Sequence, residues 1–314
     1  MCGIIGYTGA GQAAPLLLDG LEKLEYRGYD SAGIAVNDGS GIHVAKTRGR
    51  LAALRAMTHN GKDLSGTVGI GHTRWATHGR PSDENSHPHV GGDGRIAIVH
   101  NGIIENYKDL RESLEAHGYT FQSETDTETV AHLVDYLHTG KQEDLAQTVL
   151  SAVQRIRGSY ALGVVSMDNP EEIVAARRDN PLVIGIGEGE NMIASDITAI
   201  ISRTKKYIIL DDNEVAIVRP DSVVVMNEFG DVVEKAVQTV NWDLSAAEKG
   251  GYEHFMLKEI MEQPKAVADT VKPRIQNNAV CFEDNGLTDD RLREIENIHI
   301  VGCGSALHAG MVGK

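Results

Sequence analysis

The sequence predicts a mixed α+β fold with more than one domain, and three observations support this prediction. The chain has 314 residues, more than a single hydrophobic core usually holds. Its first half alternates amphipathic helical patterns with short strands, whereas residues 159–237 are short β-branched runs joined by Gly, Asp and Asn turns. Such runs are typical of antiparallel strands. We therefore expect one large antiparallel α+β domain, followed by part of a second.

Composition and charge exclude several classes of protein. At 41% hydrophobic and 24% charged residues, the chain is apolar enough to bury a core. Its net charge of −15, with dispersed Lys and Arg, argues against nucleic-acid binding. It has no apolar run long enough to cross a membrane and no signal-like N-terminus, so we expect a cytoplasmic protein without membrane contact. Cys2, Cys281 and Cys303 lack disulfide or zinc spacing, and we expect neither a metal nor a cofactor.

The chain opens with Met1-Cys2-Gly3-Ile4-Ile5-Gly6-Tyr7, an apolar strand pattern that begins with a cysteine. If Met1 is removed, Cys2 carries a thiol nucleophile and an amine base in one residue. The α-amino group has an unperturbed pKa of ~7.7–8.0, so no separate histidine is required as the base. Alternatively, Cys2 is a small hydrophobic residue at the start of a core strand. These seven residues alone leave both interpretations open.

The next elements follow from periodicity and turn residues. Four leucines at helical spacing predict a helix over residues 12–25 that ends before Gly28. The turn Asn37-Asp38-Gly39 between two apolar runs predicts a β-hairpin. A short helix is expected over residues 51–57 and a strand over residues 67–75.

A long polar loop is expected over residues 82–94, and loops of this length are typically functional. His87 and His89 lie in it, and His78 lies shortly before it. No Asp or Cys partner stands at a recognisable ligand spacing, so we expect solvated histidines rather than a metal site. The apolar strand 96–99 should then deliver the following loop residues to its end, where chemistry is often placed.

The later elements complete the prediction. We expect helices over 107–117, 126–138 and 145–157, with Thr125 or Asp126 capping the second, and strands over 161–165, 173–176, 182–186, 207–210, 215–218 and 223–226. A domain boundary is expected at 242–253, followed by a helix over 254–271 that is interrupted at Gln263-Pro264. A strand over 298–301 should lead into the turn Gly302-Cys303-Gly304-Ser305, which resembles a phosphate cradle.

Five sequence blocks in this order resemble the glutaminase half of the glutamine–fructose-6-phosphate aminotransferase family, whose glutaminase is a class II, N-terminal-nucleophile amidotransferase. The blocks are Cys2-Gly3-Ile4-Ile5-Gly6, Arg27-Gly28-Tyr29-Asp30-Ser31-Ala32-Gly33, His72-Thr73-Arg74-Trp75-Ala76-Thr77-His78-Gly79, His100-Asn101-Gly102-Ile103-Ile104-Glu105-Asn106 and Ser123-Glu124-Thr125-Asp126-Thr127-Glu128. The resemblance implies a four-layer αββα sandwich, followed by the truncated start of an α/β sugar-isomerase domain. The implied domains are a glutaminase domain (2–240), a linker with a connector helix (241–297) and the isomerase start (298–314).

The resemblance also implies catalytic roles. Cys2 would attack the side-chain amide of glutamine and form a thioester, with its own α-amine relaying the proton. Asn101 and the backbone N–H of Gly102 would form the oxyanion hole. Arg74 and Asp126 would hold the α-carboxylate and the α-ammonium of the substrate.

Further residues are implied in closure, ammonia transfer and sugar binding. Thr77 and His78 would belong to the loop that closes over glutamine, and Trp75 would gate a passage for ammonia. Gly304 and Ser305 would contribute to a sugar-phosphate loop. The implied partners are glutamine and, for a full-length homodimeric enzyme, fructose 6-phosphate.

The resemblance leaves two alternatives and one expectation about activity. The chain is alternatively the glutaminase domain of a purine or asparagine type of class II amidotransferase, or a non-catalytic sugar-phosphate regulator. The sugar loop departs from the family pattern at Ala306, where a hydroxyl is lost. Because Lys314 precedes the position of the family's Schiff-base lysine, we expect this piece to show glutaminase activity only.

Overall fold

The computed structural model describes residues 2–76, 78–138, 144–241, 251–276, 279–280, 288–302 and 304–314. The chain separates into two compact units, Met1–Leu244 and Ser245–Lys314. Most of the polar stretch predicted as the domain boundary lies outside the described residues. The division into a glutaminase domain, a linker and an isomerase start stays a prediction.

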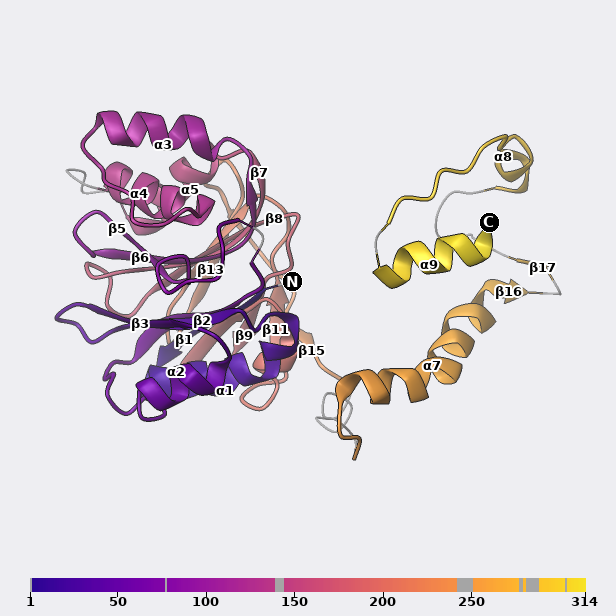
Figure 1. The fold of residues 1–314 in the computed structure, drawn as a ribbon, viewed down its shortest axis with the longest axis horizontal. Helices are drawn as coiled ribbons and strands as arrows, with labels where there is room; N and C mark the ends of the chain where they lie inside the picture. Colours follow the sequence, from indigo (N-terminus) through magenta and orange to yellow (C-terminus); the bar gives the residue numbers. More distant parts are fainter. Residues whose placement is uncertain are drawn as a thin grey trace. The chain divides into compact units, whose positions relative to one another are not determined.

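Two antiparallel sheets form the centre of the first unit (Figure 1). The larger sheet has the order β15-β11-β9-β10-β1-β4-β2-β3, and the smaller has the order β14-β13-β12-β8-β7-β6-β5. The strands of the larger sheet are β1 (Gly3–Gly9), β2 (Ser31–Asn37), β3 (Ile42–Arg48), β4 (Val68–Arg74), β9 (Val183–Ile186), β10 (Glu190–Ala194), β11 (Lys206–Ile209) and β15 (Gln238–Thr239). Those of the smaller are β5 (His89–Gly91), β6 (Ile96–Ile104), β7 (Gly158–Ser166), β8 (Ile173–Arg178), β12 (Glu214–Val218), β13 (Val223–Met226) and β14 (Val232–Val233).

Helices cover the outer faces of both sheets, as Figure 1 shows. The helices on the larger sheet are α1 (Ala13–Leu24) and α2 (Leu51–Met57), and those on the smaller sheet are α4 (Asp126–His138) and α5 (Leu145–Val153), with α3 (Tyr107–Ala116) packed on α4. Buried apolar clusters fill each layer boundary, with Leu21 and Ile34 in the first, Ile70 and Val99 between the sheets, and Ile98 and Val130 in the third. The predicted αββα sandwich is therefore confirmed.

Several predicted elements have their expected form. All seven residues of β1 are buried, and this strand lies between β10 and β4. The predicted hairpin pairs Asn37 with Ile42 across its turn. Thr125 caps α4, because its Oγ1 accepts the backbone N–H of Glu128 at 3.4 Å. These elements place the N-terminal end of β1 and the start of α4.

The expected end of the strand at residue 99 is wrong, because β6 continues to Ile104. The long strand β7 pairs with it throughout, from Ile96 opposite Ser166 to Ile104 opposite Gly158. This ladder satisfies backbone groups that a loop would leave to solvent. Asn101 and Gly102 therefore lie within a sheet, which holds them more firmly than a loop would.

The second unit has a simpler described structure. It contains α7 (Phe255–Val271), the 3₁₀ turn η3 (Lys272–Arg274), the pair β16 (Ile275–Gln276) and β17 (Ala279–Val280), α8 (Asp289–Arg293) and α9 (Gly304–Gly313). The predicted interruption at Gln263-Pro264 is wrong, since α7 runs through Pro264. Within the described parts of both units, no helix is long and apolar enough to cross a membrane.

The predicted strand at residues 298–301 is also wrong, because these residues form no regular element. Ile298 and Val301 are 78% and 96% exposed. A strand is stable only when its backbone groups pair with a neighbour, and none of the described residues supplies one here. The predicted helix does follow the glycine turn, as α9 from Gly304.

Candidate active site

Cys2 lies at the open end of β1, beside the end of β4. The register pairs Gly3 with Thr73, so the residue before β1 reaches the backbone of Trp75. The Cys2 Sγ accepts the Trp75 N–H at 3.2 Å and lies 3.5 Å from the Trp75 carbonyl oxygen. From the other sheet, the Asn101 Nδ2 donates to the Cys2 carbonyl oxygen at 3.1 Å. Cys2 is therefore held from both sheets, by its sulfur at the end of β4 and by its carbonyl oxygen at β6.

The environment keeps the Cys2 sulfur in its thiol form. Burial raises the pKa of the Cys2 thiol, and the Trp75 N–H and Arg74 oppose that rise only in part. Since the thiolate is the nucleophilic form, the sulfur needs a nearby base to take its proton.

Gly102 lies beside Asn101 in β6 and has a φ of +133°. A Cβ at this position would lie 2.1 Å from the Ser159 carbonyl oxygen, a distance that no side chain tolerates. Glycine is thus required for β6 and β7 to approach each other here. Gly102 lines the same cleft as Cys2.

Arg74 ends β4 and is only 4% exposed. Its Nη2 donates to the carbonyl oxygens of His78 and Gly79, the latter at 3.1 Å. Its Nη1 is buried and finds no hydrogen-bond partner among the described residues. A buried guanidinium with an unused donor is suited to bind a carboxylate.

Asp126 is the first residue of α4 and is 5% exposed. Its Oδ2 accepts the backbone N–H of Ile104 at 2.8 Å, which ties the start of α4 to the end of β6. Asp126 also lines the cleft that contains Cys2. The residue therefore has a structural contact and faces the site.

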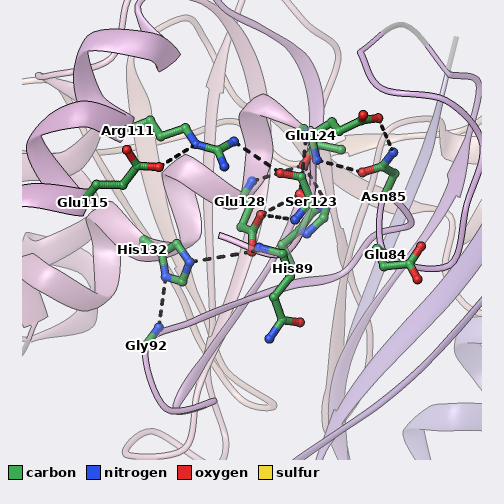
Figure 2. Close-up of polar contacts among 12 residues, drawn as sticks. Glu84, Asn85, His89, Gly92, Arg111, Glu115, Ser123, Glu124, Glu128 and His132 are labelled. Atoms are coloured by element: carbon green, nitrogen blue, oxygen red, sulfur yellow. Dashed lines mark hydrogen bonds and ion pairs between the residues drawn. The ribbon is translucent and has the colours of Figure 1, made fainter. Parts of the chain in front are cut away.

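The segment before α4 is held by a dense set of hydrogen bonds (Figure 2). Glu128 accepts the backbone N–H groups of Gln122 and Ser123 at 2.8 and 2.7 Å. Burial alone would raise the pKa of Glu128, but these bonds and the contact with His132 lower it to about 2. Glu124 and Asn85 also exchange two hydrogen bonds, of 2.9 and 3.1 Å. Together these contacts position the start of α4 and hence Asp126.

A narrow cleft of about 20 Å³ joins these groups. Its lining comprises Cys2, Arg74, Trp75, His78, His87, His100, Gly102, Thr125, Asp126 and Thr127. The cleft thus brings together most of the predicted catalytic and glutamine-binding residues that the structure describes. Asn101 joins them through its hydrogen bond to the Cys2 carbonyl oxygen. Thr77 lies outside the described residues, as does the side chain of Ser305.

Comparison with known proteins decides the family. Residues 72–202 match the family of glutamine amidotransferase domains. The whole chain is 55% identical to the glutamine–fructose-6-phosphate aminotransferase (isomerizing) of Caldanaerobacter subterraneus and 50% identical to that of Clostridium tetani. The chain belongs to the glutamine–fructose-6-phosphate aminotransferase family. It spans about half the length of these curated relatives, covering 51% of each.

Solved structures support the fold assignment within this family. The chain resembles the glutamine phosphoribosylpyrophosphate amidotransferase of B. subtilis with a TM-score of 0.63 and 27% identity, over 74% of this chain and 50% of that one. It also resembles a structure described as the allosteric regulatory enzyme of purine biosynthesis, with a TM-score of 0.63 and 28% identity, over 72% of this chain and 49% of that one. The fold is that of the class II, N-terminal-nucleophile amidotransferases.

Trp75 and His78 each have an aromatic neighbour. Trp75 is 44% exposed and meets the ring of Tyr29 edge-on, with centroids 5.3 Å apart. The His78 ring meets Tyr107 in the same way at 4.8 Å. The proposed roles of both residues in gating and closure stay predictions.

The expectation that His87 and His89 are solvated is wrong, since they are only 6% and 3% exposed. The loop folds inward, and the His87 ring stacks on His72 at 4.2 Å. Burial lowers the pKa values of His87 and His89 well below the ordinary value, so both rings stay neutral. No group of three or more metal-binding side chains occurs among the described residues.

Proposed function

We propose that the first unit hydrolyses the side-chain amide of glutamine, with Cys2 as the nucleophile. The observation that carries this proposal is the single cleft in which Cys2, Arg74, Gly102 and Asp126 meet. A thiol, an unused cationic donor and a carboxylate suit the reacting amide and the two charges of a free amino acid. The named relatives are enzymes that use glutamine.

The proposed reaction begins once Met1 has been removed, so that Cys2 has a free α-amine. The amine takes the thiol proton as the sulfur attacks the amide carbon of glutamine. The resulting oxyanion is stabilised by the Asn101 Nδ2 and the Gly102 N–H. The ammonium of Cys2 then protonates the departing nitrogen, which leaves ammonia and a thioester. Water attacks the thioester with the amine as base, and glutamate and the free thiol are released.

Substrate recognition is assigned to residues that bind the two charged groups of the amino acid. Arg74 binds the α-carboxylate through its available donor, and Asp126 binds the α-ammonium. Thr77 and His78 belong to the loop that closes over the bound glutamine. Because the closed cleft measures only about 20 Å³, this loop moves to admit a substrate.

We infer that the ammonia serves a second reaction in a longer protein, the conversion of fructose 6-phosphate to glucosamine 6-phosphate. The names of the curated relatives, which contain fructose-6-phosphate and aminotransferase, support this inference. Trp75 gates the passage of ammonia, and Gly304 and Ser305 contribute to the sugar-phosphate loop of a homodimeric enzyme. The protein acts in the cytoplasm, where reducing conditions keep the Cys2 thiol free.

The test is a measurement of glutamate and ammonia release by the purified chain, together with its intact mass. We expect both products in equal amounts and a mass that lacks Met1. A chain that retains Met1 and is still fully active would contradict the role of the Cys2 amine. In a longer protein that contains the acceptor domain, addition of fructose 6-phosphate, compared with other acceptors of ammonia, then separates this family from the purine and asparagine types.

A further inference from the structure

His72 contacts the oxyanion residue Asn101 across the two sheets and is not assigned a role by the mechanism above. It lies in β4 of the larger sheet, whereas Asn101 lies in β6 of the smaller one. The His72 Nε2 is 3.0 Å from the Asn101 Oδ1 and 3.1 Å from the His100 carbonyl oxygen. His72 is 1% exposed and Asn101 is 7% exposed, so solvent does not compete for this contact.

The contacts determine which nitrogen of His72 carries the proton. A backbone carbonyl oxygen only accepts hydrogen bonds, so the Nε2 that faces the His100 oxygen is the protonated nitrogen. The Nδ1 is buried without a hydrogen-bond partner among the described residues, which leaves no acceptor for a second proton. Burial lowers the pKa of His72 to about 3, which keeps the ring neutral. Stacking on His87 holds the plane of the ring.

The same contacts determine the orientation of the Asn101 side chain. The His72 N–H requires an acceptor, and the Cys2 carbonyl oxygen, at 3.1 Å on the other side, requires a donor. Rotation of the amide by half a turn would place donor against donor and acceptor against acceptor. It would also place an oxygen where the oxyanion of the proposed reaction forms.

We propose that His72 is a positioning residue that fixes the direction of the Asn101 amide and so aims its N–H donor at the oxyanion. The proposal rests on the glutaminase function proposed above and adds a residue to that same site. Loss of the His72 donor allows the amide to rotate, and each rotated molecule lacks one oxyanion donor. One such donor is worth ~10²–10³ in rate. Since the Cys2 carbonyl oxygen alone would keep only a minority of molecules in the active orientation, about 1–10% of them, we expect a fall in kcat of about 10–100-fold.

The variants are chosen by the position of their donor. His72→Gln places an amide nitrogen at the reach of the histidine Nε2, whereas His72→Asn places one at the reach of Nδ1 and His72→Phe has no donor. We expect His72→Gln to retain most of kcat, and the other two to lose about 10–100-fold with the KM for glutamine almost unchanged. Equal losses in the Gln and Asn variants would overturn the proposal.

A double-mutant cycle tests whether His72 acts through Asn101. In the Asn101→Ala background, His72→Phe should change kcat by less than about twofold, because no amide remains to be oriented. Multiplying losses would show an independent role and overturn the proposal. Alkylation of Cys2 by iodoacetamide forms no oxyanion, so its rate should match wild type in all folded His72 variants. A large change in that rate would show that the substitution disorders the site.

A spectroscopic measurement keeps this inference separate from the proposed function. In ¹⁵N-labelled wild-type protein, one side-chain N–H of Asn101 should be protected from hydrogen exchange by the Cys2 carbonyl oxygen. The protection should persist in His72→Gln and be lost in His72→Phe. A wild-type chain that releases no glutamate would contradict the glutaminase function alone, whereas unchanged protection in His72→Phe would overturn the role of His72.

Discussion

Substitution of Asp126 separates a structural contact from a binding contact in one side chain. The buried carboxylate accepts the Ile104 N–H at 2.8 Å, and we propose that it also binds the α-ammonium of glutamine. Asp126→Asn keeps an oxygen for Ile104 and removes the charge. Asp126→Ala removes both. The two variants should therefore have different stabilities but similar defects in binding.

The expected magnitudes follow from these contacts. Asp126→Ala leaves a buried N–H unpaired, and we expect the free energy of unfolding to fall by about 1–3 kcal/mol. Asp126→Asn should lose less than about 1 kcal/mol. An unpaired charge of a bound ligand costs about 2–5 kcal/mol, and 2 kcal/mol corresponds to roughly 30-fold in affinity. Both variants should therefore raise the KM for glutamine by at least about 30-fold.

The assay combines steady-state glutaminase kinetics with urea unfolding. Asp135→Asn is the matched control, because Asp135 lies on the same helix and is 6% exposed, against 5% for Asp126. Its KM should equal that of wild type. A wild-type KM in Asp126→Asn, with reduced stability in Asp126→Ala, would show that Asp126 is only a structural tie between α4 and β6.

Three other predictions test neighbouring groups. Asn101→Ala should lower kcat by ~10²–10³ with little change in KM, because the oxyanion forms only after attack; a loss confined to KM would indicate substrate binding instead. Gly102→Ala should destabilise the first unit by about 2–4 kcal/mol in urea unfolding, since its Cβ would lie 2.1 Å from the Ser159 oxygen; wild-type stability would refute the geometry of β6. Glu128 has a folded pKa of about 2, below its ordinary value of 4.5, so its contribution is present above pH 4.5 and is lost as the pH falls towards 2. Glu128→Gln should thus be less stable at pH 7, on the order of 3 kcal/mol, and its stability should fall less between pH 5 and 2; parallel stability curves would contradict this.

Local signals in the sequence predicted much of the fold. The turn Asn37-Asp38-Gly39 and its flanking apolar runs predicted the hairpin, and buried leucines at helical spacing predicted α1. The short strand β10 was not predicted, because Glu190–Ala194 begins with two polar residues. One of its partners, β1, is distant in the sequence. The other partner, β9, lies just before β10 in the sequence, but the turn between them was not predicted as a hairpin turn. Such strands depend on their neighbours more than on their own residues.

The site was predicted from motifs, but its supporting contacts were not. His72 and His100 lie in apolar strands, a pattern that indicates buried histidines, yet nothing local indicates that His72 reaches Asn101 in another sheet. Burial of His87 likewise depends on the path of a loop. The run at 298–301 had strand composition without a partner to pair with. Each failure depends on whether segments that are far apart in the sequence come into contact.

Glutamate release by wild-type protein and by Cys2→Ala tests whether the Cys2 thiol is the nucleophile. Both proteins are compared at equal concentration, with circular dichroism to show that each is folded and intact mass to show that Met1 is absent. We expect glutaminase activity in the wild type and none above background in Cys2→Ala, because the thiol forms the thioester. Glutamate release at the wild-type rate from folded Cys2→Ala would contradict this role.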